Sequence, residues 1–121
     1  MANSGWYGEG RRHAEAARKR RTSSPADEHA ANELINMFAV NDESLYRTLM
    51  AWKANFERKK KSGVFNKELA IKGLANNYLP VVINKYRHDF PDNYSEYIGH
   101  TVSQTTKNLA AEYALRWIES D

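Results

Sequence analysis

The amino-acid sequence predicts an all-α protein: a small bundle of about four helices preceded by a basic, mobile N-terminal arm. Large apolar residues recur at helical spacing in several segments, and no segment shows sustained alternation of apolar and polar residues. Residues 1–24 have no apolar stripe and hold three of the six glycines. With 121 residues and a mass of 13.9 kDa, the chain can bury one core. We therefore expect a flexible arm over 1–24 and one helical bundle domain over 25–121.

The clearest helix is predicted between residues 45 and 63. Its large apolar residues recur at i, i+4, i+7 and i+11, a spacing that places them on one side of a helix. They are Leu45, Leu49, Trp52 and Phe56, with Met50 widening the stripe. We expect Asn41 or Asp42 to cap the start of this helix, and Gly63 to close its end in the left-handed conformation.

A helix over residues 25–40 is predicted to precede it. Ser24 is placed to act as N-cap, Pro25 to occupy the first helical position, and Asp27 and Glu28 to lie in the first turn. The expected apolar side consists of Ala30, Ala31, Leu34, Ile35 and Phe38.

Two more helices are predicted after Gly63. The first is expected to be capped by Asn66 and to span about 66–86, and Pro80 predicts a kink or break near Leu79. The last spans about 102–118, and residues 94–100 either extend it forward or form a separate turn. The expected inner face of the 66–86 helix consists of Leu69, Ala70, Leu74, Tyr78 and Val81. That of the last helix consists of Val102, Thr106, Leu109, Tyr113 and Trp117.

Charge alternates in sign along the chain. The formal net charge is only +3, but residues 44–87 carry ten cations against two anions, and residues 1–24 carry six against two. Residues 25–43 carry five anions and no cation, and residues 88–121 carry six anions against two cations. The two basic blocks indicate an anionic partner.

The basic blocks supply the candidate binding residues. In the arm these are Arg11, Arg12, Arg18, Lys19, Arg20 and Arg21, and we expect a partner that neutralises them to order the arm. Trp6 and Tyr7 are suited to anchor the arm to a surface or to stack on a base. In the helical domain the candidates are Arg58, Lys59, Lys60, Lys61 and Lys67.

The cluster at residues 58–61 has two interpretations. A solvated helix end favours cations because they complement the helix dipole, but four adjacent cations exceed what that requires. A phosphate-contacting patch is the alternative. Lys53, Lys72, Lys85 and Arg87 would extend this patch if the second and third helices packed antiparallel. The arm favours the second interpretation, because flexible arginine-rich segments beside basic faces recur in nucleic-acid binders.

No sequence motif indicates catalysis or metal binding. The absence of cysteine excludes disulfides, thiolate chemistry and cysteine-based zinc sites. The four histidines lack the spacing of a metal-binding helix, and there is no glycine-rich phosphate loop or nucleophile elbow. We therefore predict a protein that is not an enzyme and has no metal, cofactor or small-molecule substrate. No apolar run approaches the roughly 18 residues of a membrane span, so we expect no membrane partner and a cytoplasmic location.

Residues 41–118 resemble a small helical domain of unknown function that is common in bacteriophage genomes. The shared features are a Leu-Tyr start, a basic patch followed by glycine and an aromatic residue, and a Leu-Ala-x-Lys helix that ends in Lys-Tyr. Here they are Leu45-Tyr46, Asn55, Arg58-Lys59-Lys60, Gly63, Phe65, Leu69-Ala70-Ile71-Lys72 and Lys85-Tyr86. The chain differs by Pro80 and by the basic arm. The resemblance implies a helical fold and a phage-like origin, and hence a host-cytoplasmic location, but no site.

Leu45-Tyr46-Arg47 and the downstream Phe56 also resemble the mitochondrial LYR-motif adaptor family, whose members are three-helix proteins that bind acyl carrier protein. In that family the motif lies near the start of the chain, whereas here an arm and a helix precede it.

The sequence thus predicts a non-enzymatic helical protein that binds nucleic acid or an RNA-rich assembly. Binding would rest on phosphate contacts and be largely independent of sequence. The alternative is a protein-protein interaction module, such as an adaptor, an assembly subunit or an inhibitor of a host protein.

Overall fold

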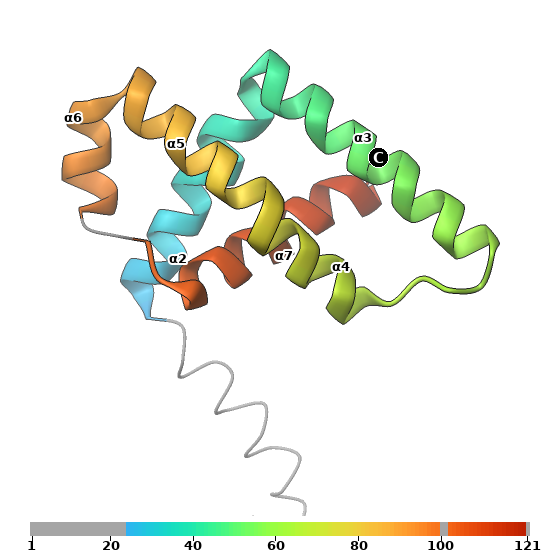
Figure 1. The fold of residues 1–121 in the computed structure, drawn as a ribbon. Helices are drawn as coiled ribbons and strands as arrows, with labels where there is room; N and C mark the ends of the chain where they lie inside the picture. The colour runs from blue at the N-terminus through green and yellow to red at the C-terminus, as the bar shows by residue number, and fades with distance from the viewer. Residues whose placement is uncertain (1–23, 100–101, 121) are drawn as a thin grey trace, which may run out of the picture.

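The computed structural model describes residues 24–99 and 102–120. Within these ranges the chain forms helices joined by short links and contains no strand, which confirms the predicted all-α bundle (Figure 1). The predicted arm, apart from Ser24, lies outside the described residues.

The helices follow one another in three groups. The first is α2 (Pro25–Asn32), the π-type turn η2 (Glu33–Phe38) and the short η3 (Ala39–Asn41). The second is α3 (Glu43–Lys61), followed by α4 (Lys67–Gly73), the π-type turn η4 (Leu74–Tyr78) and α5 (Leu79–Asp89). The third is α6 (Pro91–Asn93), η5 (Tyr94–Ile98) and α7 (Gln104–Ser120).

The helix starts are capped as the sequence predicts. The Asp27 backbone N–H donates to Ser24 Oγ at 3.1 Å, and the Ser24 N–H donates back to Asp27 Oδ2 at 3.0 Å. The Leu45 N–H donates to Asp42 Oδ1 at 3.0 Å, so Asp42 rather than Asn41 caps α3. Asn66 caps α4 in the same way. Each cap satisfies a donor that the first helical turn leaves without a partner.

Gly63 closes α3 with a φ of +75°, as predicted. The Gly63 N–H donates to the Lys60 carbonyl at 3.1 Å, and the Val64 N–H donates to the Lys59 carbonyl at 3.0 Å. This pair of bonds is the Schellman arrangement, which requires a left-handed residue after the last helical turn. The chain therefore leaves α3 sharply and reaches α4 through a short link.

The inner face of α4–η4–α5 differs from the prediction at both ends. Ala70, Leu74 and Tyr78 are buried as expected, but Leu69 is 66% exposed and Val81 is 52% exposed. Burial follows every fourth residue, through Ala70, Leu74, Tyr78, Val82 and Tyr86. In a regular α-helix such a row drifts by about 40° at each step. The wider turn η4 offsets this drift and keeps Val82, rather than Val81, on the core side. Pro80 lies in the first turn of α5, just after the predicted break near Leu79.

Helix α3 packs antiparallel to α4–η4–α5. The start of α3 meets the end of α5, where Lys85 Nζ lies 3.3 Å from Asp42 Oδ2. Further along, the Trp52 ring packs against Gly73 so closely that a Cβ there would lie 3.4 Å from it. The absence of a side chain at Gly73 thus leaves room for the Trp52 ring.

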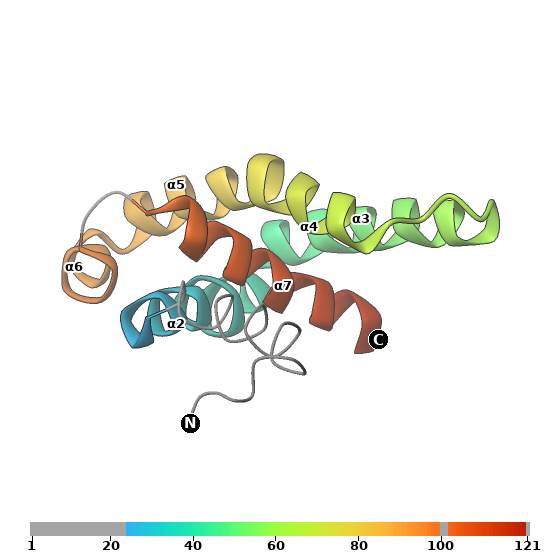
Figure 2. The same ribbon diagram turned by 90° about the horizontal axis from the view of Figure 1, so that it is seen from below.

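Helix α7 runs parallel to α2–η2 and lies between it and the layer of α3, α4 and α5 (Figure 2). Side-chain hydrogen bonds link the pair near both ends, from Thr106 to Asp27 and from Trp117 to Asn36. The buried face of α7 is Thr106, Ala110, Ala111, Ala114, Leu115 and Ile118.

This burial pattern corrects the prediction for the last helix. Val102 and Thr106 are buried, but Leu109 and Tyr113 are only partly buried, and Trp117 is 39% exposed. Three alanines form the centre of the contact because a helix covered on two sides needs small residues for close approach. The larger side chains lie at the edge of this contact.

Residues 94–98 form the separate turn η5 and do not extend α7. The Gly99 N–H donates to the Tyr94 carbonyl at 2.8 Å, and Gly99 has a φ of +88°. Tyr94 is buried and Ile98 packs against the core, whereas Tyr97 remains 38% exposed.

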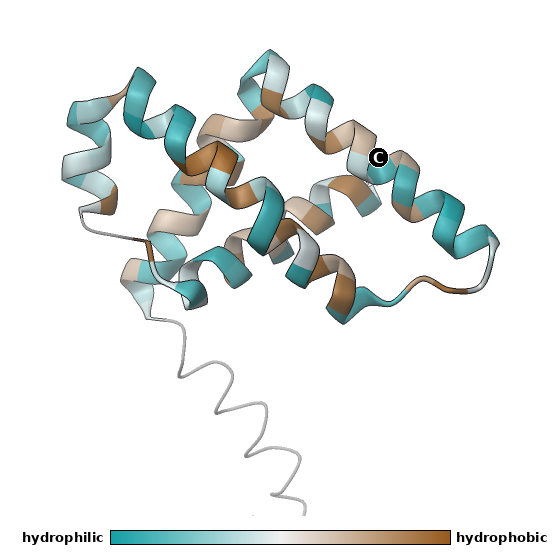
Figure 3. Ribbon diagram, viewed as in Figure 1, coloured by the Kyte–Doolittle hydropathy of each residue, from teal (hydrophilic) through white to brown (hydrophobic). Residues whose placement is uncertain are grey.

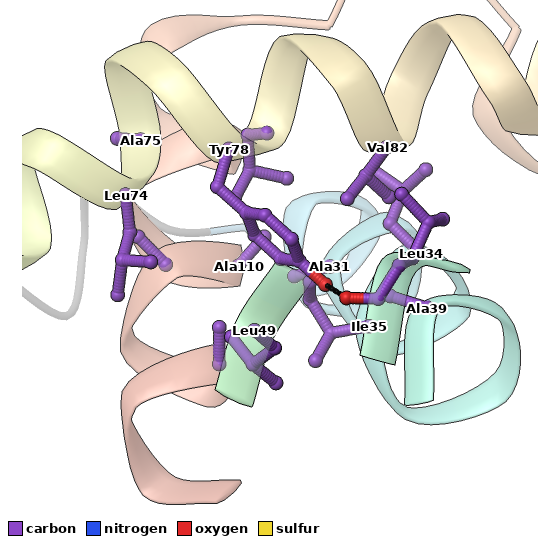
Figure 4. Packing of buried hydrophobic residues seen from close by; sticks show 14 of the residues in the cluster. Ala31, Leu34, Ile35, Ala39, Leu49, Leu74, Ala75, Tyr78, Val82 and Ala110 are labelled. Atoms are coloured by element: carbon purple, nitrogen blue, oxygen red, sulfur yellow. Dashed lines mark hydrogen bonds between the residues drawn. The ribbon is translucent and has the colours of Figure 1, made fainter. Parts of the chain in front are cut away.

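The core is centred on Tyr78, whose ring lies among aliphatic side chains from several helices (Figure 4). Its hydroxyl donates to the Leu45 carbonyl oxygen at 2.8 Å. Burial, with a smaller contribution from the charge of Asp42, raises the pKa of this hydroxyl well above its usual value. The group therefore stays a neutral donor, because ionisation would leave a buried charge.

Substituting Tyr78→Phe removes this hydroxyl while keeping the ring. We expect the free energy of unfolding to fall by about 1–2 kcal/mol, because a buried hydrogen bond is lost and the core keeps its shape. Urea denaturation measures the change. Tyr97→Phe is the matched control and should change stability by less than about 0.5 kcal/mol; equal effects would contradict the role of Tyr78.

Asp27 links two helices and predicts an acid-sensitive contribution to stability. The Ser24 N–H and the Thr106 hydroxyl, the latter at 2.7 Å, both donate to its carboxylate and hold its pKa below the ordinary value of 3.8. A lowered folded-state pKa means that the stabilisation is complete above the unfolded pKa and is lost as the pH falls through the folded one.

We therefore expect Asp27→Asn to be less stable than the parent at neutral pH, by about 1 kcal/mol. The difference should shrink as the pH falls below 3.8, because the lowered folded-state pKa lies below that value. Urea denaturation over this pH range measures it. Asp92→Asn, which removes an exposed carboxylate, is the control, and its stability should follow that of the parent across this pH range. If the stability difference between Asp27→Asn and the parent does not change with pH, the role assigned to the Asp27 carboxylate is wrong.

Candidate nucleic-acid interface

Five predicted binding residues lie at one end of the molecule, where α3 ends and α4 begins (Figure 1). We call them the basic tip: Arg58, Lys59, Lys60 and Lys61 in the last turn of α3, and Lys67 at the first position of α4. All five are exposed. The structure thus brings the two sequence-predicted parts of the patch to the same end of the bundle.

The position of the tip follows from where the core stops. Phe56 is the last buried residue of α3, and the helix continues beyond it to Lys61. Phe65 folds back from the link and meets the Phe56 ring at 5.6 Å between centroids. The last turn of α3 therefore has solvent on most sides. Figure 3 shows the hydrophilic end of α3 next to the more hydrophobic link.

The cations of the tip are largely free of internal partners. Lys60 Nζ lies 4.0 Å from Glu119 Oε2 and 4.8 Å from the centroid of the Phe65 ring. Among the described residues, no carboxylate lies within salt-bridge distance of Arg58, Lys59, Lys61 or Lys67. Four neighbouring positive charges consequently repel one another and remain available to an external anion.

The antiparallel packing does not gather all the cations that the sequence suggested. Lys85 lies at the opposite end of α3, where it pairs with Asp42 at 3.3 Å and with Asp89 at 3.5 Å. Arg87 donates to Asn84 Oδ1 and lies over the Tyr94 ring. The expectation that these two residues extend the patch is therefore wrong, because antiparallel helices place the end of α5 beside the start of α3.

Lys85 instead has a structural role. Burial acts to raise the pKa of Asp42, but hydrogen bonds from the Leu45 N–H and the Ser44 hydroxyl, together with Lys85, outweigh it and lower that pKa. The same contact raises the pKa of Lys85. Lys53 and Lys72 flank the Trp52–Gly73 crossing, between the two ends.

The arm residues Arg11, Arg12, Arg18, Lys19, Arg20 and Arg21 lie outside the described residues, as do Trp6 and Tyr7. Their part in the interface stays a prediction.

Two exposed apolar residues at the tip were not predicted. Val64 is 65% exposed in the link, and Leu69 is 66% exposed on the first turns of α4. Leu69 lies one residue before the buried row that Ala70 and Leu74 begin, and helical spacing in the sequence did not reveal that it falls outside this row. Val64 carried no helical signal, because a residue in a link belongs to no helical face.

The described residues contain no group of three or more His, Asp or Glu side chains placed to hold a metal ion. His88 pairs with its neighbour Asp89, and His29 packs edge-on against Tyr97. None of the described helices is long and apolar enough to cross a membrane.

Comparison of the chain with protein-family models, with curated proteins and with solved structures yields no match. The resemblances to a phage helical domain and to the LYR-motif family therefore stay predictions. The geometry and charge of the basic tip are the features that point to a function.

Proposed function

We propose that this protein binds nucleic acid, or an assembly rich in RNA, through the basic tip and the N-terminal arm, and that it catalyses no reaction. The observation that carries the proposal is the group of four adjacent exposed cations at the end of α3, of which only Lys60 lies within salt-bridge distance of a carboxylate in the described part of the chain. A cluster that served only the helix dipole would gain about 0.3–1 kcal/mol for each charge and would not require four adjacent cations.

The geometry suits a phosphate backbone better than a single small anion. Arg58 offers a planar fork for two phosphate oxygens, whereas the lysines act as point charges on flexible stems. The cations project from a protruding helix end, so they can follow a chain of phosphates. Such contacts release bound counterions and do not read the base sequence.

Replacing Arg58, Lys59, Lys60 and Lys61 together with glutamine tests the tip. We expect the affinity for generic DNA and RNA to fall, and the slope of log K against log salt concentration to become shallower by up to about 3–4. Fluorescence anisotropy at several salt concentrations measures both. An unchanged affinity and slope would overturn the proposal.

A charge-matched comparison separates the tip from net charge. Lys59→Gln with Lys61→Gln removes two cations of the tip, whereas Arg87→Gln with Lys107→Gln removes two from elsewhere on the surface. We expect the first pair to weaken binding more than the second. Equal losses would mean that total charge, not the tip, governs binding.

The arm is tested in the full chain by replacing its six cations, Arg11, Arg12, Arg18, Lys19, Arg20 and Arg21, with glutamine. We expect a further loss of affinity and a further decrease of the salt slope beyond the tip variant. If affinity does not fall further than in the tip variant, the arm is not part of the interface.

A protein partner is the second candidate function, and exposed Val64 and Leu69 favour it. Apolar side chains beside cations are suited to an acidic protein surface with an apolar centre. Capture from nuclease-treated lysate distinguishes the two functions. Recovery of one protein at fixed ratio, abolished by Val64→Ser with Leu69→Ser, would favour the protein partner. A phage-like origin would place either partner in the host cytoplasm.

A further inference from the structure

An exposed aromatic surface lies along α7 and η2, on a part of the molecule that the sequence assigned to the core. Its residues line a shallow pocket of about 270 Å³: Asn36, Tyr113, Arg116, Trp117 and Ser120. We call this surface the aromatic platform. It contains tryptophan, tyrosine and arginine, the residue types whose flat faces stack on nucleic-acid bases.

The Trp117 ring is held in place by a short chain of side-chain hydrogen bonds. Its indole Nε1–H donates to Asn36 Oδ1 at 2.7 Å, and Asn36 Nδ2 donates in turn to Asn32 Oδ1 at 2.8 Å. The polar edge of the ring is therefore satisfied within the protein. The ring remains 39% exposed, so part of its apolar surface faces solvent in a fixed orientation.

Arg116 provides a second planar group beside this ring. Its guanidinium lies over the Tyr113 ring, 5.1 Å from the centroid. This contact places the guanidinium over an aromatic face and leaves its positive charge on the surface. The platform thus combines stacking surfaces with a cation.

The platform lies on the same helix that meets the basic tip. Glu119 of α7 is 4.0 Å from Lys60 in the tip. At about 100° per residue, Arg116 lies about 60° round the helix from Glu119, and Trp117 a further 100° or so. Arg116 consequently lies between the tip and the tryptophan. Lys60 lies near Glu119, whereas exposed Glu112 lies one helical turn before Arg116, on the same side of α7.

We propose that the aromatic platform is a base-stacking site, and that the ligand is therefore single-stranded nucleic acid. This inference rests on the proposed function, because the basic tip supplies the phosphate contacts. A duplex keeps its base faces stacked on one another, whereas unpaired bases can stack on Trp117 and on the Arg116 fork. A strand that leaves the tip across Arg116 meets the indole next.

The test uses the full chain with a fluorescent oligothymidine strand and the same strand in a duplex. We expect the single strand to bind more tightly than the duplex at equal salt. Trp117→Ala should weaken single-strand binding by about 5- to 150-fold, the range for losing one stacked base. It should leave duplex binding and the salt slope unchanged, because no phosphate contact is removed.

Three further variants guard against a general loss of structure. Tyr97→Ala removes a similarly exposed ring, which lies against His29, and should leave affinity unchanged. Trp117→Phe should retain part of the affinity because it keeps an aromatic face. Asn36→Ala keeps the indole but removes the hydrogen bond that orients it. This variant should therefore lose less affinity for the single strand than Trp117→Ala does. Circular dichroism melts confirm that each variant folds.

Tryptophan fluorescence gives an independent readout. Stacking of a base on an indole quenches its emission, so the single strand should quench the parent protein. Because Trp6 is itself suited to stack on a base, the comparison is made in chains that carry Trp6→Phe; there Trp117→Phe should lose that quenching, while Trp52 remains as background. Quenching that persists at equal size in Trp117→Phe would overturn the assignment.

The outcomes for the two proposals are distinguishable. If the tip variant weakens binding but Trp117→Ala does not, or if single strand and duplex bind equally, the stacking site is wrong and the proposed function stands. If the tip variant has no effect, the proposed function is wrong. If Trp117→Ala instead abolishes nuclease-resistant recovery of a protein, the platform is a protein contact and the stacking site is refuted.

Discussion

The hydrogen bond from the buried Tyr78 hydroxyl to the Leu45 carbonyl sets the relation between the two long helical units. A phenol at the centre of the core requires a partner there, because an unsatisfied buried polar group costs about 1–3 kcal/mol. The first turn of α3 supplies that partner, so η4 must lie opposite the start of α3. Sliding one unit along the other by a turn would break this bond and displace the Trp52–Gly73 contact with it.

The register fixed in this way determines which charges meet and which stay apart. Asp42 and Lys85 come together at one end, where each side chain stabilises the charged form of the other. At the other end the core stops at Phe56, and the helix that follows carries only polar and charged side chains. Within the described residues the charges of the tip stay exposed, and only Lys60 lies near a carboxylate, that of Glu119. An exposed basic projection is the physical result, and it is the basis of the functional proposal.

Local features of the sequence predicted local features of the fold well. Ser24, Asp42, Asn66 and Gly63 act as caps because each needs only the backbone of its own turn. The apolar side of the 25–40 helix is buried for a related reason, since helical spacing alone places its residues on one face. In the 45–63 helix Leu45, Leu49 and Phe56 are buried, whereas Met50 and Trp52 are only partly buried. The prediction failed at Leu69, Val81 and Trp117. Their burial depends on the wide turn η4 and on which flank of α7 its neighbours cover.

The sequence by itself determined the helical class, the ends of the helices and the clustering of Arg58–Lys61, because hydrogen bonding and charge within a few residues suffice for these. Only the tertiary structure decided that Lys85 and Arg87 lie away from the tip and that Trp117 faces solvent. These outcomes depend on packing between segments distant in the chain. Alanines at the centre of α7 occupy the contact that the larger Trp117 would otherwise fill.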